Sequence, residues 1–505
     1  MSKMNQDLLG LLAKVSDILT QLNCPAYIVG GFVRDWLLGR KTDDIDIAVK
    51  GDALSIAQQV ARAIDGKYVL LDETNKIARV VITGENLWHL DFTSFSNDIQ
   101  DDLARRDFTI DAMAVELQAL IFGSPKLIDP FSGKSDLKKK LIRAVSQRIF
   151  IDDAARLLRA VRLAAELGFK IAPATESLIR KDCQLARLVP GERVREELVR
   201  LLALPGSAAS IRYLDKLGLL IAIIPELQEL KGARQPKEHY WDVFNHSVET
   251  VATAELLLRE SKWKYGEDDL LTATPWSEEI SRHFDEEVSS GSNRRLLLKL
   301  GALMHDIAKP ATRTVDETGR TRFLGHGKEG AAIAVTVLER LRFSSRETRL
   351  VENLIYHHLR PAQMANDGLP TSRAVYRYFR DTEGAGIDVL FIALADYLAT
   401  HGPKLDIEEW KQHNLLISFI LTEHSRQETK VLPVKLIDGH DLMDIFGLRP
   451  GRLLGELLAE VRESQAAEEL STRDEALELV RKELEKRQAA RPVEIMQPNQ
   501  IDRNR

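Results

Sequence analysis

The spacing of hydrophobic residues divides the chain into two parts. Between residues 24 and about 130, short runs rich in β-branched and aromatic residues show partial alternation of apolar and polar positions, which predicts strands separated by helices. These runs are AYIVGG, DIDIAV, KYVLLD, IARVVIT and LWHLDFTSF. From about residue 150, apolar residues recur every three or four positions, as in DDAARLLRAVRLAAELG, where Gly168 is expected to end a helix. The pattern predicts an α+β fold, with a small mixed sheet and helices in an N-terminal head, followed by all-α domains.

Changes in this pattern indicate where domains begin and end. Residues 1–23 predict an amphipathic helix, and the polar, acidic stretch Ser261–Asn293 predicts an insertion or a mobile lid. Helical spacing returns in KLIDGHDLMDIFGLRPGRLLGELLAEVRE, whereas the last residues, RQAARPVEIMQPNQIDRNR, are expected to be disordered. We therefore expect a head over residues 1–145, a helical neck over 146–232, a third domain over 233–425, a helical tail over 426–490 and a disordered terminus over 491–505.

Composition is that of an ordinary globular protein with several domains. The chain has 505 residues, of which 44% are hydrophobic and 29% charged, and this length favours about three domains. No run approaches the roughly 18 apolar residues of a membrane span, and the N-terminus lacks the features of a secretion signal. Only Cys24 and Cys183 are present, so we expect a reducing cytoplasm rather than a disulfide framework.

The charge balance limits the kind of nucleic-acid contact. A net charge of −6 argues against a protein that coats nucleic acid. Basic residues nevertheless gather in Leu137–Arg148, Arg156–Arg162 and Gly191–Arg200. A local basic groove for a nucleic-acid substrate therefore stays open.

The stretch YIVGGFVRDWLLGRKTDDIDIAV, Tyr27–Val49, combines a glycine turn, an arginine and two carboxylates. Residues i and i+2 of a strand share a face, so Asp44 and Asp46 are expected to project together. Such a pair is unfavourable without a cation, and Mg²⁺ prefers carboxylate oxygens together with substrate phosphates. Gly30 and Gly31 would let the backbone approach a triphosphate at the start of the next helix.

Two further side chains extend this candidate site. Arg34, one turn into the helix, is expected to reach the same phosphates, and Asp91 on a neighbouring strand is expected to face the metal. Two metal ions held there would clamp the attacking and leaving oxygens of a phosphoryl displacement. The alternative is a plain turn before a surface helix, with acids on a solvated strand; the combination favours the catalytic interpretation.

These residues carry a family resemblance. VGGFVRDWLLGR…DDIDIAV resembles the signature of class II CCA-adding tRNA nucleotidyltransferases and bacterial poly(A) polymerases, within the polymerase-beta nucleotidyltransferase superfamily. RRDFTIDAMAV, IDPFSGKSDLKKKLIR, DDAARLLRAVR, GERVREELVRLL and the tail DGHDLMDIFGLRPGRLLGELL resemble further elements of that family in the same order. The resemblance implies addition of C and/or A from CTP and ATP to the 3′ end of tRNA, with Mg²⁺ as cofactor.

The resemblance also assigns residues to nucleotide binding. The family's RRDFTxN element implies that Arg106 and Asp107 contact ribose and phosphates, and its Glu-Asp-x-x-Arg element implies that Asp153 and Arg156 read the base. On a helix these two lie at i, i+3 on one face, where a carboxylate and a guanidinium match the edges of C or A. Arg159 and Arg162 would continue that face toward the triphosphate. An ordinary surface ion pair is the alternative for such spacing.

The sequence departs from the family at two positions. Asp152 stands where the family commonly has Glu, and Asp111 where it commonly has Asn. Both changes leave the nucleotide preference open, so addition of C only or of A only remains an alternative to complete CCA addition. Poly(A) polymerase is a further alternative, although it often carries a basic tail that this chain lacks.

A second set of residues has the order His…His-Asp…Asp: His246, His305, Asp306 and Asp396. This order resembles an HD-domain metal phosphohydrolase, and the mixture of nitrogen and oxygen donors suits a divalent metal. His326 and His357 are candidates for a second ion, and Lys309 for a phosphate contact. The resemblance implies hydrolysis of phosphate esters such as a 2′,3′-cyclic phosphate.

Two alternatives to this second activity stay open. The third domain could be a structural body that grips tRNA, or the HD site could carry the main activity while the head only binds nucleotide. We expect no membrane partner, and the sequence leaves the oligomeric state unknown.

Overall fold

The computed structural model describes residues 6–84, 87–266, 268–365, 368–429, 435–467 and 469–489. The chain divides into two compact units, one formed by Met1–Glu229 with Val337–Ser344 and the other by Leu230–Thr336 with Ser345–Arg505. Each unit is described by itself. A head with a sheet followed by largely helical structure confirms the predicted α+β class, whereas the four predicted domain boundaries within the chain remain predictions.

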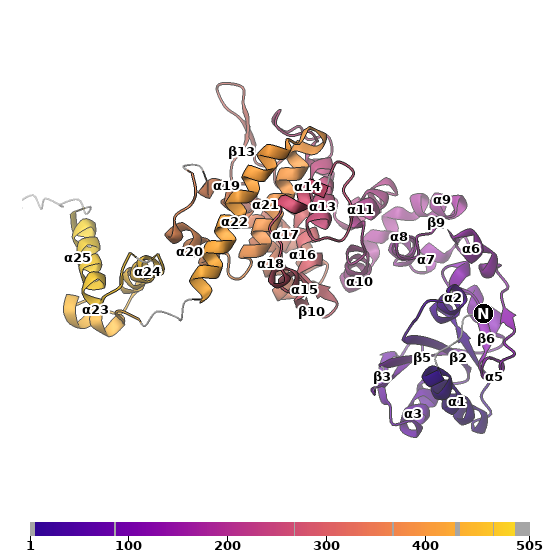
Figure 1. Cartoon of the computed structure of the whole chain (residues 1–505). Coiled ribbons are helices and arrows are strands. Elements are labelled where there is room, and N and C mark those ends of the chain that lie inside the picture. Colours follow the sequence, from indigo (N-terminus) through magenta and orange to yellow (C-terminus); the bar gives the residue numbers. More distant parts are fainter. Residues whose placement is uncertain are drawn as a thin grey trace, which may run out of the picture. The chain divides into compact units, whose positions relative to one another are not determined.

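The head is built on one mixed seven-stranded sheet (Figure 1). Only β2 and β5 run parallel among the paired strands of this sheet in the described residues; the other pairs are antiparallel. All five strand-like runs read from the sequence form strands, which confirms the alternation. In sheet order the strands are β3 (Lys67–Asp72), β4 (Ile77–Ile82), β5 (Trp88–Phe95), β2 (Asp44–Lys50), β1 (Ala26–Val29), β6 (Ala114–Glu116) and β7 (Leu127–Ile128).

Helices complete the head. Helix α3 packs on β4 and β5 and against α1, and a core that includes Val29, Ala48 and Phe95 fills another part of the head. The N-terminal helix expected from the sequence is α1. The helices are α1 (Gln6–Gln21), α2 (Gly30–Leu38), α3 (Ala53–Ala63), α4 (Ile99–Ala104), the 3₁₀ turn η1 (Thr109–Asp111), α5 (Leu117–Ile121) and α6 (Gly133–Lys139).

The rest of the first unit is helical apart from one short parallel strand pair. Gly168 ends α8 in the left-handed region with φ of 64°, as its position in the sequence predicted. The elements are β8 (Leu141–Ile142), α7 (Ile149–Asp152), α8 (Arg156–Leu167), β9 (Lys170–Ile171), α9 (Pro173–Asp182), η2 (Cys183–Leu188), α10 (Gly191–Leu202), α11 (Ser207–Lys216), α12 (Leu219–Ile223) and η3 (Pro225–Leu230).

The core of the second unit is a set of packed helices, with α13 against α16 and α21, and α16 also against α18. No single helix among the described residues is long and apolar enough to cross a membrane; one pair, Ser372–Asp381 with Gly386–Lys404, passes that test only together, with a bend of 101°. The helices are α13 (Val243–Leu257), α14 (Asp268–Ala273), α15 (Glu278–Asp285), α16 (Arg294–Met304), α17 (His326–Arg340), α18 (Ser345–His357), α19 (Arg360–Met364), α20 (Ser372–Asp381), α21 (Gly386–His401), η4 (Gly402–Lys404) and α22 (Ile407–Thr429).

Two small hairpins belong to this unit, β10 (Glu287–Ser289) with β11 (Ser292–Asn293), and β12 (Arg313–Val315) with β13 (Thr321–Phe323). The first lies in the stretch expected to be an insertion or a mobile lid. In that stretch Phe284 of α15 is fully buried and packs against Phe391 of α21, with ring centroids 4.8 Å apart. Helix α15 is therefore part of the core of this unit rather than a lid.

The C-terminal helices α23 (Gly439–Phe446), α24 (Arg452–Ala466) and α25 (Arg473–Ala489) share a small core that includes Leu442, Leu457 and Val480. The predicted tail helices are thus present. The terminus 491–505, expected to be disordered, lies outside the described residues.

A tight contact between α6 and η1 gives a test of the head fold. A methyl group on Gly133 would lie 2.1 Å from the carbonyl oxygen of Thr109, so Gly133→Ala must push these elements apart. We expect a loss of about 1–3 kcal/mol in the free energy of unfolding, the usual range for overpacking, measured as a lower midpoint of urea unfolding. Gly10→Ala is the control, because Gly10 lies exposed in α1 with nothing within 4 Å of the added methyl group. Helix propensity favours that change by roughly 0.5–1 kcal/mol, and equal effects of both substitutions would contradict the contact.

Candidate functional site

Three carboxylates meet on one part of the head sheet. Asp44 and Asp46 lie two residues apart on β2 and therefore share a face of the sheet. Ile45 and Ile47 alternate with them and are fully buried on the other face. The parallel register of β2 and β5 pairs Asp46 with Asp91. The sequence-based expectation that these three side chains come together therefore agrees with the geometry, while their catalytic role remains a prediction.

The three acids have different surroundings. The guanidinium of Arg79 binds Asp91 through two bonds of 2.7 and 2.8 Å, and Nδ1 of His89 lies 3.0 Å from Asp44. Asp46 accepts a hydrogen bond from the backbone N–H of Gly31. Burial raises the pKa of Asp46; the charge of Arg106 opposes this shift, and that of Asp91 adds to it. A divalent cation among these oxygens would relieve the repulsion, so the donor set fits one.

Gly30 fits closely beneath this cluster. It has φ of +70°, and a Cβ atom there would lie 2.5 Å from Oδ2 of Asp46 and 2.5 Å from Nη1 of Arg106. A side chain at this position would therefore displace the central carboxylate. The sequence suggested a glycine turn before the helix, but α2 already begins at Gly30, so both glycines lie in its first turn, where backbone N–H groups face outward.

Arg34 lies buried below the same helix end. Its guanidinium donates to Asp35 at 2.8 and 3.1 Å and to Asp111 at 2.7 Å. Burial raises the pKa of Asp111 to about 6, although the charge of Arg34 opposes the shift. Asp111, noted as a departure from the family pattern, is thus the ionic partner of Arg34. The structure shows this network, and a phosphate contact by Arg34 stays a prediction.

Asp153 and Arg156 come close without sharing a helix. The prediction of one continuous helical face is wrong, because α7 ends at Asp152, Asp153 is extended with φ of −151°, and α8 begins at Arg156. Their charged groups are 3.8 Å apart. Arg193 of α10, which the sequence did not single out, donates to both carboxylate oxygens of Asp153 at 2.9 and 2.8 Å. Burial alone would raise the pKa of Asp153, but the bonds and charge of Arg193 outweigh it and lower the pKa.

The remaining neck arginines are fixed by a buried glutamate. Glu197 of α10 accepts from Arg159 at 3.0 Å and from Arg162 at 2.6 Å, and Arg159 also donates to Asp107 at 3.2 Å. Arg106 donates to Asp102 at 3.2 Å. The sequence showed a family resemblance over the residues of α10 but did not single out Glu197, because only the tertiary packing brings Glu197 to these arginines.

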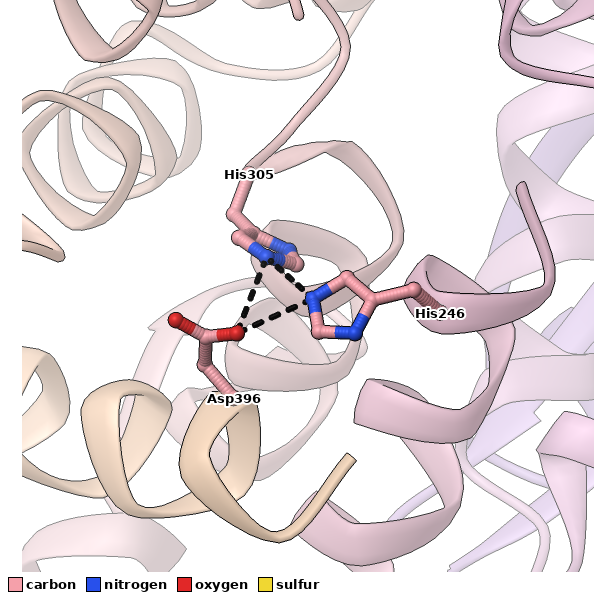
Figure 2. Close-up of side chains that lie close together, drawn as sticks. All are labelled: His246, His305 and Asp396. Atoms are coloured by element: carbon pink, nitrogen blue, oxygen red, sulfur yellow. Dashed lines mark hydrogen bonds and ion pairs between the residues drawn. The ribbon is translucent and has the colours of Figure 1, made fainter. Parts of the chain in front are cut away.

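The second unit contains a cluster of His and Asp side chains. Nε2 of His246 lies 2.9 Å from Asp396 and 3.3 Å from Nε2 of His305, so the three side chains point at one another from α13, α21 and the end of α16 (Figure 2). Asp306 adds a carboxylate 3.2 Å from Nε2 of His305. The four residues read from the sequence are thus brought together.

Asp306 also faces a second group of ligands. Its other oxygen, Oδ1, lies 3.4 Å from Nε2 of His326 and 4.0 Å from Nε2 of His358, and the two rings approach to 3.2 Å. The prediction of His357 in this place is wrong. Val351, Leu354, Ile355 and His358 are buried at helical spacing, whereas His357 is half-buried, so the periodicity itself pointed to His358. The described residues therefore hold two groups of possible metal ligands, one of His246, His305 and Asp396 and one of Asp306, His326 and His358. Oδ2 of Asp306 also lies 3.4 Å from Nε2 of His246 and 3.2 Å from Nε2 of His305, so Asp306 borders both groups.

Hydrogen bonds orient three of the rings. Nδ1 of His305, His326 and His358 each lies 2.6 to 2.9 Å from a backbone carbonyl oxygen three residues earlier in the chain. Donation from Nδ1 leaves Nε2 free to face the centre, which is the arrangement of a metal-bound imidazole. Burial lowers the pKa of His305, but the charges of Asp306 and Asp396 outweigh it and raise the pKa to about 10. The centre thus favours positive charge, as a divalent cation would supply.

Other polar groups surround this centre. Nζ of Lys309 lies 2.6 Å from Asp306 and donates to Gln235 at 2.6 Å. His239, missed in the sequence, stacks edge-on against His246, and burial lowers its pKa to about 4, with the charge of Lys309 acting in the same direction. Lys309 is held by a ligand carboxylate, and a phosphate contact by it stays a prediction.

The fold and the two sites define a nucleotidyltransferase head joined to an HD domain. Family comparisons match "Poly A polymerase head domain" over residues 26–143, "Probable RNA and SrmB- binding site of polymerase A" over 168–231, "HD domain" over 243–401 and "tRNA nucleotidyltransferase domain 2 putative" over 331–480. The chain belongs to the class II CCA-adding tRNA nucleotidyltransferase family with an HD domain, and it is an enzyme of that class.

Relatives extend over nearly the whole chain. It is 33% identical to the A-adding tRNA nucleotidyltransferase of Deinococcus radiodurans, over 90% of this chain and 95% of the relative. It is 32% identical to the CC-adding tRNA nucleotidyltransferase of Thermus thermophilus, over 89% and 92%. A CCA-adding enzyme solved with ATP shares the fold with a TM-score of 0.64 at 24% identity, covering 95% of this chain and 96% of the other. The Thermotoga maritima CCA-adding enzyme solved with tRNA gives a TM-score of 0.60 at the same identity and coverage.

Adjacent histidines test the second metal position. His358→Ala removes an Nε2 donor from the centre, and we expect binding of the second Mn²⁺ ion to weaken by about tenfold or more, measured as bound metal per chain in equilibrium dialysis. His357→Ala is the matched control, because this neighbouring ring lies outside both ligand groups. Equal metal content in the two variants would contradict the assignment of His358.

Proposed function

We propose that this chain is a template-independent nucleotidyltransferase that adds C and/or A from CTP and ATP to the 3′ end of tRNA. One observation carries the proposal: Asp44, Asp46 and Asp91 meet on one face of the sheet, next to the glycine-started end of α2. That arrangement suits a cation and a triphosphate together. Relatives named for addition of CC and of A both match nearly the full chain, which supports the reaction and leaves the added bases open.

Asp44, Asp46 and Asp91 would hold Mg²⁺ in this reaction. When bound, the metal supplies charge stabilisation for the phosphoryl transfer. The N–H groups at the start of α2 and the side chain of Arg106 would bind the phosphates, and Asp107 with Arg159 would complete the pocket wall beside them. Gly30 keeps the space between the carboxylate of Asp46 and Arg106 open.

Base selection in this proposal depends on an exchange of partners. Both oxygens of Asp153 bind Arg193, so a base amine must take the place of at least one of these bonds. Nη2 of Arg156 donates a hydrogen bond to the carbonyl oxygen of Arg105 at 2.8 Å, and this bond fixes the guanidinium beside Asp153. The lowered pKa of Asp153 keeps its carboxylate ionised, as an acceptor for the exocyclic amine of C or A.

A single substitution tests the acid cluster. Asp46→Ala removes the central carboxylate, and we expect nucleotide incorporation to fall by about 10³-fold or more, because a bound metal contributes several kcal/mol to phosphoryl transfer. Binding of ATP is expected to persist in part, through the helix end and arginines. The assay supplies tRNA that lacks its 3′ terminus, with CTP alone, ATP alone or both, and counts the added residues. Near-normal addition by Asp46→Ala would refute the carboxylate mechanism.

The same assay contains a control and decides the alternatives. Asp43→Ala changes an exposed acid just before β2 and is expected to leave addition intact. Two added residues with CTP indicate a CC-adding enzyme, one added with ATP on a CC end indicates an A-adding enzyme, and both indicate complete CCA addition. Long A tracts on unrelated RNA would favour poly(A) polymerase, the alternative supported by the descriptions of two matching families.

For the second unit we propose a phosphohydrolase activity. His246, His305, Asp306 and Asp396 would hold one divalent metal, and His326 and His358 with Asp306 a second. Metal bound there supplies a water of lowered pKa for attack on a phosphate ester. A structural body for tRNA is the competing role. The predicted cytoplasmic location also remains part of the proposal; Cys24 and Cys183 are both free thiols in the structure.

Loss of one ligand separates the two activities. His305→Ala is expected to abolish hydrolysis of 2′,3′-cyclic AMP, because it removes the ring at the centre of the first ligand group. Nucleotide addition by the same variant reports on the head and is expected to stay near the wild-type rate. If the wild-type protein, loaded with Mn²⁺, Ni²⁺ or Mg²⁺ in turn, hydrolyses no phosphate ester, the phosphohydrolase proposal is wrong.

A further inference from the structure

A pocket of about 380 Å³ opens at the side of the HD metal centre. Its lining residues are Gly232, Ala233, Arg234, Pro310, Arg313 and Phe323. A volume of this order lies within the range of small-molecule sites. None of these residues is a candidate metal ligand.

Three contacts place the pocket next to the metal centre. The carbonyl oxygen of Phe323 lies 2.6 Å from Nδ1 of the ligand His326. Lys309 precedes Pro310, and its ammonium lies 2.6 Å from Asp306 and 5.7 Å from the centroid of the Phe323 ring. Gln235, which follows Arg234, accepts a hydrogen bond from the same ammonium at 2.6 Å. Lys309 therefore lies close both to the ligand carboxylate and to a lining residue of the pocket, and Gln235 is its hydrogen-bond partner.

The two arginines of the pocket are available for a ligand. Both are exposed, and within the described part of the chain neither makes an ion pair or a side-chain hydrogen bond. By contrast, Arg322 of the neighbouring β13 already has a partner, because it donates to Asp316 at 2.8 Å within the hairpin. Guanidinium groups bind phosphate through paired N–H donors, and two of them on one small pocket favour a phosphate dianion or a phosphodiester.

We propose that this pocket binds a second phosphate of the substrate, so that the HD site acts on nucleotide phosphate esters that carry another phosphate one nucleotide unit away. The proposal rests on the phosphohydrolase activity proposed above. The scissile phosphate lies at the metal centre, the second phosphate binds Arg234 and Arg313, and Phe323 offers an aromatic face to the nucleoside between them. The end of an RNA strand and a free nucleoside bisphosphate share this chemistry.

The first experiment compares substrates that share a 3′-phosphate. With the full chain, kcat/KM is measured for adenosine 3′-phosphate, adenosine 3′,5′-bisphosphate and the dinucleotide ApAp with a terminal 3′-phosphate. We expect the two probes with a second phosphate to be preferred by about tenfold or more over the first. The double variant with Arg234→Ala and Arg313→Ala is expected to lose most of that preference, roughly tenfold, mainly through KM. Preference for ApAp over the bisphosphate assigns the pocket to RNA ends, and the reverse assigns it to free nucleotides.

The control and a second readout keep the test independent of folding and of hydrolysis. Arg320→Ala changes an arginine of the same hairpin outside the pocket and is expected to keep the wild-type preference. Binding of adenosine 3′,5′-bisphosphate is also measured by calorimetry in EDTA, where we expect the double variant to bind about tenfold more weakly. The difference between wild type and the double variant isolates the pocket from nucleotide binding by the head.

The outcomes separate the two proposals. If no ester is hydrolysed but the double variant still binds the bisphosphate more weakly than wild type, the assignment of the pocket is supported and the phosphohydrolase proposal is wrong. If esters are hydrolysed but the double variant keeps both the preference and the affinity of wild type, the pocket assignment is overturned while the phosphohydrolase stands.

Discussion

Repulsion between carboxylates is the constraint around which the head is organised. The parallel pairing of β2 with β5 sets Asp46 beside Asp91, with Asp44 two residues away on the same face. Like charges this close are unfavourable unless cations or N–H donors offset them. The guanidinium of Arg79 offsets the charge of Asp91, Nδ1 of His89 lies 3.0 Å from Asp44, and the N–H of Gly31 donates to Asp46. Gly30 leaves room for the central carboxylate because it has no side chain. The remaining negative charge would attract a cation, and the cation would in turn bind the phosphates of a triphosphate.

The second unit meets the same electrostatic problem with different donors. Asp306 is almost fully buried and offers one oxygen to His246 and His305 and the other to His326 and His358. In the head, strand register gathers the acids; here, packed helices bring in ligands that are far apart in sequence. Four of the six candidate ligands there are histidines, and a mixture of imidazole nitrogen and carboxylate oxygen suits transition metals better than carboxylates alone do.

Much of this structure follows from local sequence patterns, and the rest depends on tertiary contacts. The strands, the shared face of Asp44 and Asp46 and the stop at Gly168 follow from period-two alternation and glycine chemistry, so the sequence predicted them. The break at Asp153 was missed because both flanking segments have helical spacing. Arg193 and Glu197 lie on a helix about 40 residues further along and become partners of Asp153, Arg159 and Arg162 only through packing. His358 was recoverable, since burial at helical spacing distinguishes it from His357.

Three rings of the HD centre are anchored to carbonyl oxygens three residues before them. Each of these hydrogen bonds joins residues only three positions apart, so the direction in which Nε2 points is set locally and does not depend on the other ligands. Little conformational entropy then remains to be lost when an ion arrives. The three imidazole rings are thus oriented before any ion binds, and removal of one ring should leave the orientation of the other two unchanged.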